Sequence, residues 1–305
     1  MKDSVSFNAK SKRDKETGAS PWLQTVFGKD KEENMIAIVT DSSVGYSAEE
    51  IASRGVLSVV PLNYQLGPNF YEEYAAGHNG SYMQMMKQLS PCKTAQPTLN
   101  HFIRTFSSLV ESGYEVICIV LSSALSGTYS SACFAAGQVG GRIRVIDSAT
   151  IGAGMHLLVD EAVNMVKCGL SFEEIAQHLE GLKKKIGMVF TVESLDRLLF
   201  GGRLNNAKAK TNLNLRPVFE LKSKIVFKGN ARGLRERLEE MVSLVPENTR
   251  RLIVCRCGED TDVTEFTQML KQRLPSVYIH QRVAGPVLSI HVDEGAFGAA
   301  YILKD

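Results

Sequence analysis

The chain has 305 residues, of which 44% are hydrophobic and 22% are charged, and its formal net charge at pH 7 is +2. This composition is typical of a folded globular protein and excludes a chain that is disordered throughout. The nearly balanced charge gives no reason to expect a nucleic-acid partner, for which a strongly basic face is typical.

Residues 1–34 are largely polar and contain no apolar core of a signal peptide, so we expect a flexible leader. No apolar run approaches the roughly 18 residues of a membrane helix, so we do not expect an integral membrane protein. Six scattered cysteines are too sparse for a disulfide scaffold, which favours reduced thiols and a cytoplasmic location. Cys255 and Cys257 would share one face of a strand; they are either half of a metal site or two small buried residues. The second interpretation is favoured and no metal is expected, because no second Cys/His pair with zinc spacing exists.

Strand and helix patterns alternate between residues 35 and 185. Buried-strand patterns occur at 36–39, 57–66, 116–121 and 144–146. Helices are predicted at 47–54, 81–89, 98–109, from 128 onward, at 152–167 and at 171–185. Capping boxes at Ser47 with Glu50 and at Ser171 with Glu174 begin two of these helices, and 71–80 and 94–97 are expected to be loops. The alternation predicts right-handed crossovers and a parallel sheet.

The order of elements changes after residue 185. Strands are predicted at 187–192, 217–221, 224–227, 252–257, 277–281 and 286–292, and a terminal apolar segment at 297–303. Helices are predicted at 195–200, 232–244 and 263–274. We therefore expect an α/β protein of two domains, with a parallel sheet in residues 35–185 and a mixed sheet in residues 186–305.

Polar loops at 40–43, 94–98, 122–128 and 147–150 should gather at one edge of the parallel sheet, where ligands bind in such folds. Ser126, Gly127 and Thr128 begin a helix directly after a buried strand. The free N–H groups of a helix start favour a carboxylate or phosphate, although an ordinary N-cap has the same sequence pattern.

Two further residues could contact an anion. His291 is predicted at the end of an apolar strand, where it could donate a hydrogen bond or be a structural histidine. Arg203 follows Gly201 and Gly202, which suits either an oxyanion contact or a helix C-cap followed by a solvated arginine. The chain contains neither a complete dinucleotide fingerprint nor a Walker A motif, so no nucleotide cofactor is expected.

These motifs together resemble the DegV family from about residue 35 to the end of the chain. The resemblance rests on Thr40-Asp41-Ser42, Thr94-x-Gln96-Pro97, the run from Ser122 to Ala132, Asp147-Ser148, Gly201-Gly202-Arg203, Gly285-Pro286, His291 and Gly295. The sequence departs from the usual pattern at Ala95, Asp293 and Glu294, the last two of which put acids next to His291 in the sequence.

The resemblance implies two α/β domains with a long-chain fatty acid, such as palmitate, stearate or oleate, in a tunnel between them. It implies that Thr94, Ser126 with Gly127, and His291 hold the carboxylate, and that Arg203 lies near the opening. It also implies a non-catalytic subunit that presents the carboxylate to a separate ATP-dependent fatty acid kinase, which forms an acyl-phosphate for phospholipid synthesis.

Two other functions use the same residues. The first is a serine esterase or thioesterase with Ser126 and His291, but the G-x-S-x-G elbow and a clear acid for His291 are missing from the sequence. The second is a sensor of a phosphosugar or another anion at the same loops.

Overall fold

The computed structural model describes residues 35–76, 82–204, 215–258 and 262–304. The predicted leader at 1–34 lies outside these residues. Residues 34–305 form one compact unit, and the division into domains at residue 185 stays a prediction. Among the described helices, none combines the length and the apolar character that crossing a membrane requires.

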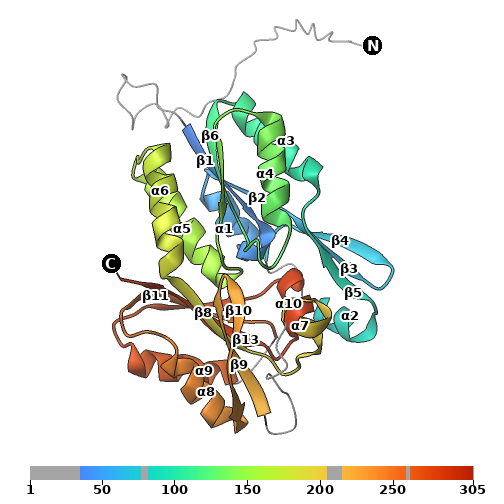
Figure 1. Cartoon of the computed structure of the whole chain (residues 1–305), viewed down its shortest axis with the longest axis vertical. Coiled ribbons are helices and arrows are strands. Elements are labelled where there is room, and N and C mark those ends of the chain that lie inside the picture. The colour runs from blue at the N-terminus through green and yellow to red at the C-terminus, as the bar shows by residue number, and fades with distance from the viewer. Residues whose placement is uncertain (1–34, 77–81, 205–214, 259–261, 305) are drawn as a thin grey trace, which may run out of the picture. The chain divides into compact units, whose positions relative to one another are not determined.

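The first sheet is parallel throughout, as predicted (Figure 1). Its order is β2-β1-β6-β7, and its strands are β2 (Leu57–Val60), β1 (Met35–Asp41), β6 (Tyr114–Val120) and β7 (Ile143–Asp147). The central strands β1 and β6 are almost wholly buried, which explains their unbroken apolar runs.

Helices cover both faces of this sheet. They are α1 (Ala48–Ser53), α3 (Leu99–Glu111), α4 (Thr128–Val139), α5 (Ala153–Lys167) and α6 (Phe172–Leu182). Both predicted capping boxes are present, at the starts of α1 and α6, and Thr98 caps α3. Phe102 and Phe106 of α3 pack with α4 against one face, whereas α5 and α6 contribute to the core on the other face.

The second sheet is mixed and has the order β10-β9-β8-β13-β11-β12. Its strands are β8 (Ile186–Thr191), β9 (Leu215–Lys222), β10 (Lys224–Arg232), β11 (Thr249–Arg256), β12 (Ile279–Val283) and β13 (Phe297–Leu303), and only the β11–β12 pair is parallel. Helices α8 (Gly233–Ser243) and α9 (Asp262–Arg273) pack on one face. Helix α5 contacts β13, β11 and β8 as well as β1, so it belongs to the cores of both sheets.

A third, antiparallel sheet was not predicted. Its strands are β4 (Asn69–Glu73), β3 (Leu62–Leu66) and β5 (Cys92–Ala95). Helix α2 (Tyr82–Gln88) lies between β4 and β5 in the chain. The single strand predicted at 57–66 is wrong, because it is divided at Pro61, which has no N–H for a strand ladder. The segments 71–73 and 94–95, expected to be loops, are parts of β4 and β5.

The segment Pro286–Val292 is helix α10 rather than the predicted strand. Proline is favoured at the first helical position, because its missing N–H has no partner there in any case. The short helix α7 (Asp196–Phe200) agrees with the prediction and ends at Gly201. The two remaining helical turns are the 3₁₀ segments Ser42–Val44 and Lys183–Lys185.

The turn between β9 and β10 contacts the loops of the first sheet. The backbone N–H of Ser223 donates to the carbonyl of Ala149 over 3.0 Å, and the Ser122 hydroxyl donates to the carbonyl of Ser223 over 2.9 Å. Ser223 and Ala149 both have positive φ, at 61° and 56°, which is unfavourable for residues with a side chain. Two hydrogen bonds and two strained residues therefore join the second sheet to the carboxyl edge of the first.

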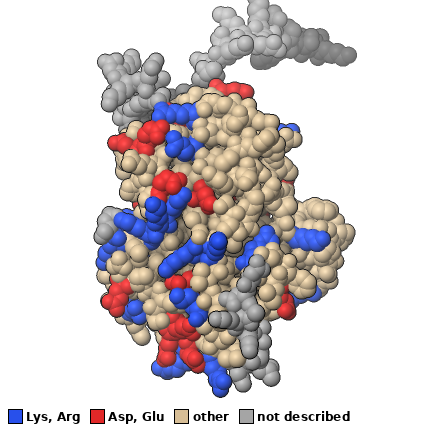
Figure 2. Space-filling model, viewed as in Figure 1, with Lys and Arg blue, Asp and Glu red and all other residues tan. Residues whose placement is uncertain are grey.

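An ionic cluster joins α5 to its neighbours. The half-buried carboxylate of Asp160 accepts hydrogen bonds from Tyr46, Arg54 and Arg251 at 2.8–2.9 Å. Burial alone would raise the pKa of this carboxyl, but His156 and these three partners lower it to about 2. On the face of the molecule that Figure 2 shows, acidic side chains also lie beside basic ones.

Candidate ligand-binding site

A largely apolar cavity lies where the three sheets meet, at the carboxyl edge of the first sheet. Its empty volume is about 970 Å³, which includes space open to solvent. The second and third sheets, the segments that follow β6 and β7, and α10 all contribute lining residues. They include Leu62, Thr94, Leu121, Leu125, Ser126, Met188, Phe190, Leu198, Arg203, Leu221, Ile225, Cys255, Cys257, Val287, Leu288 and His291. The cavity is thus a largely hydrophobic space with a few polar groups.

Thr94 and His291 form a direct pair at the cavity wall. The Thr94 Oγ1 atom lies 2.7 Å from His291 Nε2, although 197 residues separate the two in the chain. Thr94 comes from β5 and His291 from α10, so both depend on elements that the sequence did not predict correctly. Burial, together with the charges of Arg203 and Arg197, lowers the pKa of His291 to about 4. The imidazole is therefore neutral at pH 7.

Ser126 also lines the cavity, in the loop before α4. Its hydroxyl lies 2.9 Å from Thr128 Oγ1 and accepts a 3.3 Å hydrogen bond from the Thr128 backbone N–H. Ser126 therefore makes the contact typical of an N-cap and also lines the cavity. The adjacent Gly127 leaves room for Gln96, since a Cβ atom at residue 127 would lie 2.3 Å from the Gln96 side-chain oxygen.

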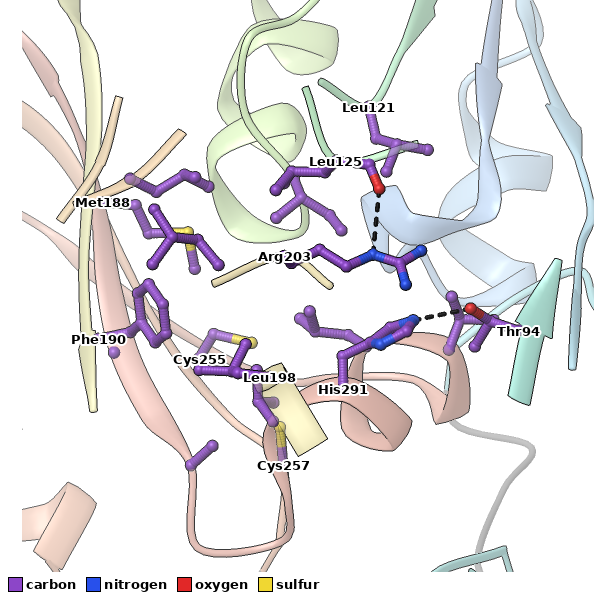
Figure 3. A pocket seen from close by; sticks show the side chains of 18 of the residues that line it. Thr94, Leu121, Leu125, Met188, Phe190, Leu198, Arg203, Cys255, Cys257 and His291 are labelled. Carbon is purple, nitrogen blue, oxygen red and sulfur yellow. Dashed lines mark hydrogen bonds between the residues drawn. The ribbon is translucent and has the colours of Figure 1, made fainter. Parts of the chain in front are cut away.

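Arg203 contributes a positive charge near His291. Its Nε donates to the Leu125 carbonyl over 3.2 Å and its Nη1 to the Gly201 carbonyl over 2.6 Å. Burial lowers the pKa of the guanidinium, as expected for a cation partly removed from water. Figure 3 shows that Arg203, His291 and Thr94 lie at the same end of the cavity. The interpretation of Arg203 as a purely solvated side chain after a C-cap is therefore wrong.

The opposite end of the cavity is apolar. Figure 3 shows Met188 and Phe190 there, with Cys255 and Cys257 along the floor. Burial raises the pKa of the Cys255 thiol to about 11 and that of Cys257 still further, so both are neutral. Within the described ranges, no group of three or more His, Cys, Asp or Glu side chains could hold a metal ion. The two thiols act as apolar wall residues.

The sequence analysis did not identify most of the apolar residues that line the cavity. Met188 and Phe190 alternate along β8, and Leu221 and Ile225 flank the turn between β9 and β10. Alternation places Met188 and Phe190 on one face of their strand, and this signal was available. What the sequence could not show is that this face is turned toward the loops of the first sheet.

The two acids after His291 do not line the cavity. Asp293 adopts φ 80° and ψ 172°, a region almost reserved for glycine, and its Oδ2 accepts a 2.9 Å hydrogen bond from the Ser194 N–H. Burial raises the pKa of this carboxyl to about 6. Glu294 forms an ion pair with Lys87 at 2.8 Å. The third departure, Ala95, does line the cavity, beside Thr94.

Comparison with known proteins identifies the family of the chain. The model of the DegV family of uncharacterised proteins matches residues 35–304. A DegV domain-containing protein of Streptococcus pyogenes is 30% identical over 272 residues, which span 86% of this chain and 96% of the relative.

Two solved structures illustrate the similarity in fold. A stearic acid-binding protein from Eubacterium ventriosum is 28% identical, with a TM-score of 0.77 over 88% of this chain and 99% of its own. The fatty acid kinase B3 protein of Streptococcus pneumoniae, solved with linoleic acid, is 20% identical, with a TM-score of 0.78 over 88% of this chain and all of its own. The second match shows a common fold alone. On the family model and the streptococcal relative, the chain belongs to the DegV family.

Proposed function

We propose that the protein binds one long-chain fatty acid, with the acyl chain in the apolar cavity and the carboxylate at Thr94, Ser126, Gly127 and His291. The observation that supports this most directly is the asymmetry of the cavity. Thr94, Arg203 and His291 lie together at one end, and Met188 and Phe190 line the other. An amphiphile with one small polar head and a long apolar tail matches this arrangement.

The acyl chain supplies most of the expected affinity. A chain of about 16 carbons contributes on the order of 10 kcal/mol, at about 0.8 kcal/mol for each buried CH₂, before the cost of ordering is subtracted. Such a contribution favours retention of the lipid through purification.

The head group needs only a few hydrogen-bond donors. The hydroxyls of Thr94 and Ser126 and the N–H of a neutral His291 can donate to a carboxylate, and Arg203 adds a positive charge nearby. A bound carboxylate would in turn favour the protonated imidazole and raise the pKa of His291.

The same geometry supports a carrier rather than an esterase. No hydrogen bond joins Ser126 to His291: the imidazole Nε2 meets Thr94, and the serine hydroxyl meets Thr128. The carboxylate of Asp293 accepts from the Ser194 N–H. An activated nucleophile requires a base within hydrogen-bond reach, and that base oriented by a third group.

The carrier would present its carboxylate to a separate ATP-dependent kinase subunit, which forms the acyl-phosphate used in phospholipid synthesis. Two observations support this part of the proposal: the chain has no Walker A motif, and its fold is that of a fatty acid kinase B protein. The position of Arg203 beside the head-group residues suits a contact with such a partner. The expected location is the cytoplasm.

Native mass spectrometry of freshly purified protein, followed by gas chromatography of the extracted lipid, tests the proposal. We expect a stoichiometric adduct of fatty-acid mass, with a reduced occupancy in Ser126→Ala. Ser123→Ala is the matched control, because Ser123 belongs to the same loop but does not line the cavity. A protein without an adduct that also fails to take up added stearic acid would contradict the proposed ligand, and uptake of a phosphosugar instead would favour the anion sensor.

A further inference from the structure

Glu73 is a buried carboxylate that lies outside the cavity and next to the helix that bears His291. Its side chain is 5% exposed. Its Oε1 accepts a 3.3 Å hydrogen bond from the Val287 N–H of α10, and its Oε2 accepts a 3.0 Å hydrogen bond from the Ser42 hydroxyl. The Ser42 oxygen in turn accepts from the Leu62 N–H over 3.0 Å. One carboxylate therefore joins α10 to the edge of the first sheet.

The contact falls at the start of α10, where it has the greatest effect. Val287 is the second helical residue after the N-cap Gly285, and the first N–H groups of a helix have no partner within the helix. A negative charge is also favoured there by the helix dipole. Gly285 packs so closely on Glu73 that a Cβ atom at residue 285 would lie 2.1 Å from Oε1.

The position of α10 determines the head-group end of the cavity. Val287, Leu288, His291 and Val292 of this helix all line the cavity. A shift of the helix would therefore move both the apolar wall and the imidazole.

Glu73 and Thr94 belong to the same small sheet. Glu73 of β4 pairs with Leu62 of β3, and Thr94 of β5 pairs with Tyr64 of β3. The sheet thus holds Thr94 directly and holds His291 through the contact of Glu73 with α10. The distance from Thr94 Oγ1 to His291 Nε2 depends on both connections.

The environment of Glu73 is costly for a charge. Burial, with a smaller contribution from the nearby Asp41, raises the pKa of this carboxyl to about 7. The ring hydroxyls of Tyr64 and Tyr82 lie near this carboxyl. Arg282 lines a second, smaller cavity together with Glu73. Both carboxylate oxygens of Glu73 accept hydrogen bonds at this buried place, and one of these bonds comes from α10.

We infer that Glu73 is a positioning residue for the head-group site, which anchors α10 so that His291 meets Thr94 at the end of the acyl cavity. The ligand in this inference rests on the proposed function, whereas the effect on the histidine does not.

The test uses two variants of similar size in the delipidated full-length chain. Glu73→Gln keeps an acceptor for the Val287 N–H, and Glu73→Met removes it. NMR titration of the His291 ring, identified by the signals that Glu73 variants share with wild type and His291→Gln lacks, reports the geometry. Uptake of stearic acid reports the site.

We expect His291 of the wild type and Glu73→Gln to titrate near the same pH. In Glu73→Met we expect the imidazole pKa to rise by about one unit or more, because a displaced α10 exposes the ring to water. Stearic acid affinity should fall about tenfold or more in the same variant. Glu115→Met, which removes another buried carboxylate from β6, should change neither quantity.

Gly285→Ala provides a second perturbation that keeps Glu73, and it decides the matter if Glu73→Met does not fold. The added methyl displaces the Glu73 carboxylate, so the histidine titration should move in the same direction. An unchanged His291 titration in either folded variant would overturn the inference. If the wild type takes up no stearic acid but the variants show the expected change in the His291 pKa, only the proposed ligand is overturned.

Discussion

The neutral state of His291 predicts a specific loss of stability in acid. The pKa of this imidazole falls from its ordinary value of 6.5 to about 4 in the folded protein, chiefly because of burial. Between these values the unfolded chain binds a proton that the folded protein does not, so the folded state loses stability as the pH falls from 7 to 4. The full effect is about 3 kcal/mol, of which about 2 kcal/mol is lost by pH 5.

Urea unfolding of delipidated wild type and His291→Gln at pH 8 and pH 5 measures this effect. Every other titrating group is common to both proteins, so the change in the difference between them isolates His291. Glutamine retains an N–H donor toward Thr94 without a charge change in this range. We expect His291→Gln to gain about 2 kcal/mol relative to wild type on going from pH 8 to pH 5. If the difference in unfolding free energy between the two proteins is the same at pH 8 and pH 5, the ring is solvated or already paired with an acid. The reasoning from burial would then be refuted.

Three further predictions concern the wall, the ionic cluster and the anchor of α10. Phe190→Ala should shift the preferred ligand toward longer acyl chains, because it opens the apolar end; competition between acids of different length checks this, and an unchanged ranking would contradict it. Asp160→Ala should cost about 3–5 kcal/mol of unfolding free energy, measured in urea, since it leaves Arg54 and Arg251 without this partner. Glu73→Gln should gain about 3 kcal/mol relative to wild type between pH 4 and pH 9, because ionisation of the buried Glu73 destabilises the fold as the pH rises; a pH-independent difference in urea midpoints would argue against it.

The sequence was most informative where burial is uniform or a cap is local. Strands β1 and β6 are buried along nearly their whole length, so their apolar runs are unmistakable, and the capping boxes at Ser47 and Ser171 need only four residues to form. The fold class follows from these elements. The rule that ligands gather beyond the carboxyl ends of parallel strands correctly brought Ser126 to the cavity.

The pairing of Thr94 with His291 could not be predicted from the residues alone. Strand β5 has only four residues, with a half-exposed pattern, and its partner β3 was hidden in an apparent continuation of β2. In the run from Pro286 to Val292, apolar residues occupy most positions, and a short run of this kind does not distinguish a strand from a helix. Thr94 was identified as a ligand residue only through the family resemblance, which contains spatial information that local pattern lacks. His291 was also a candidate from its position in the sequence, but without a partner.

Helix α5 packs against both halves of the chain, so the folding of one half depends on the other. Buried residues occur around most of its circumference, because it packs on β1 of the first sheet and on β8, β11 and β13 of the second. A fragment ending at residue 185 would expose the side of α5 that the second sheet covers, and a fragment beginning at 186 would lack a cover for that sheet. We therefore expect the halves to fail as separate products and to recover when they are expressed together. Substitutions of the buried α5 side chains should therefore affect the packing of both halves.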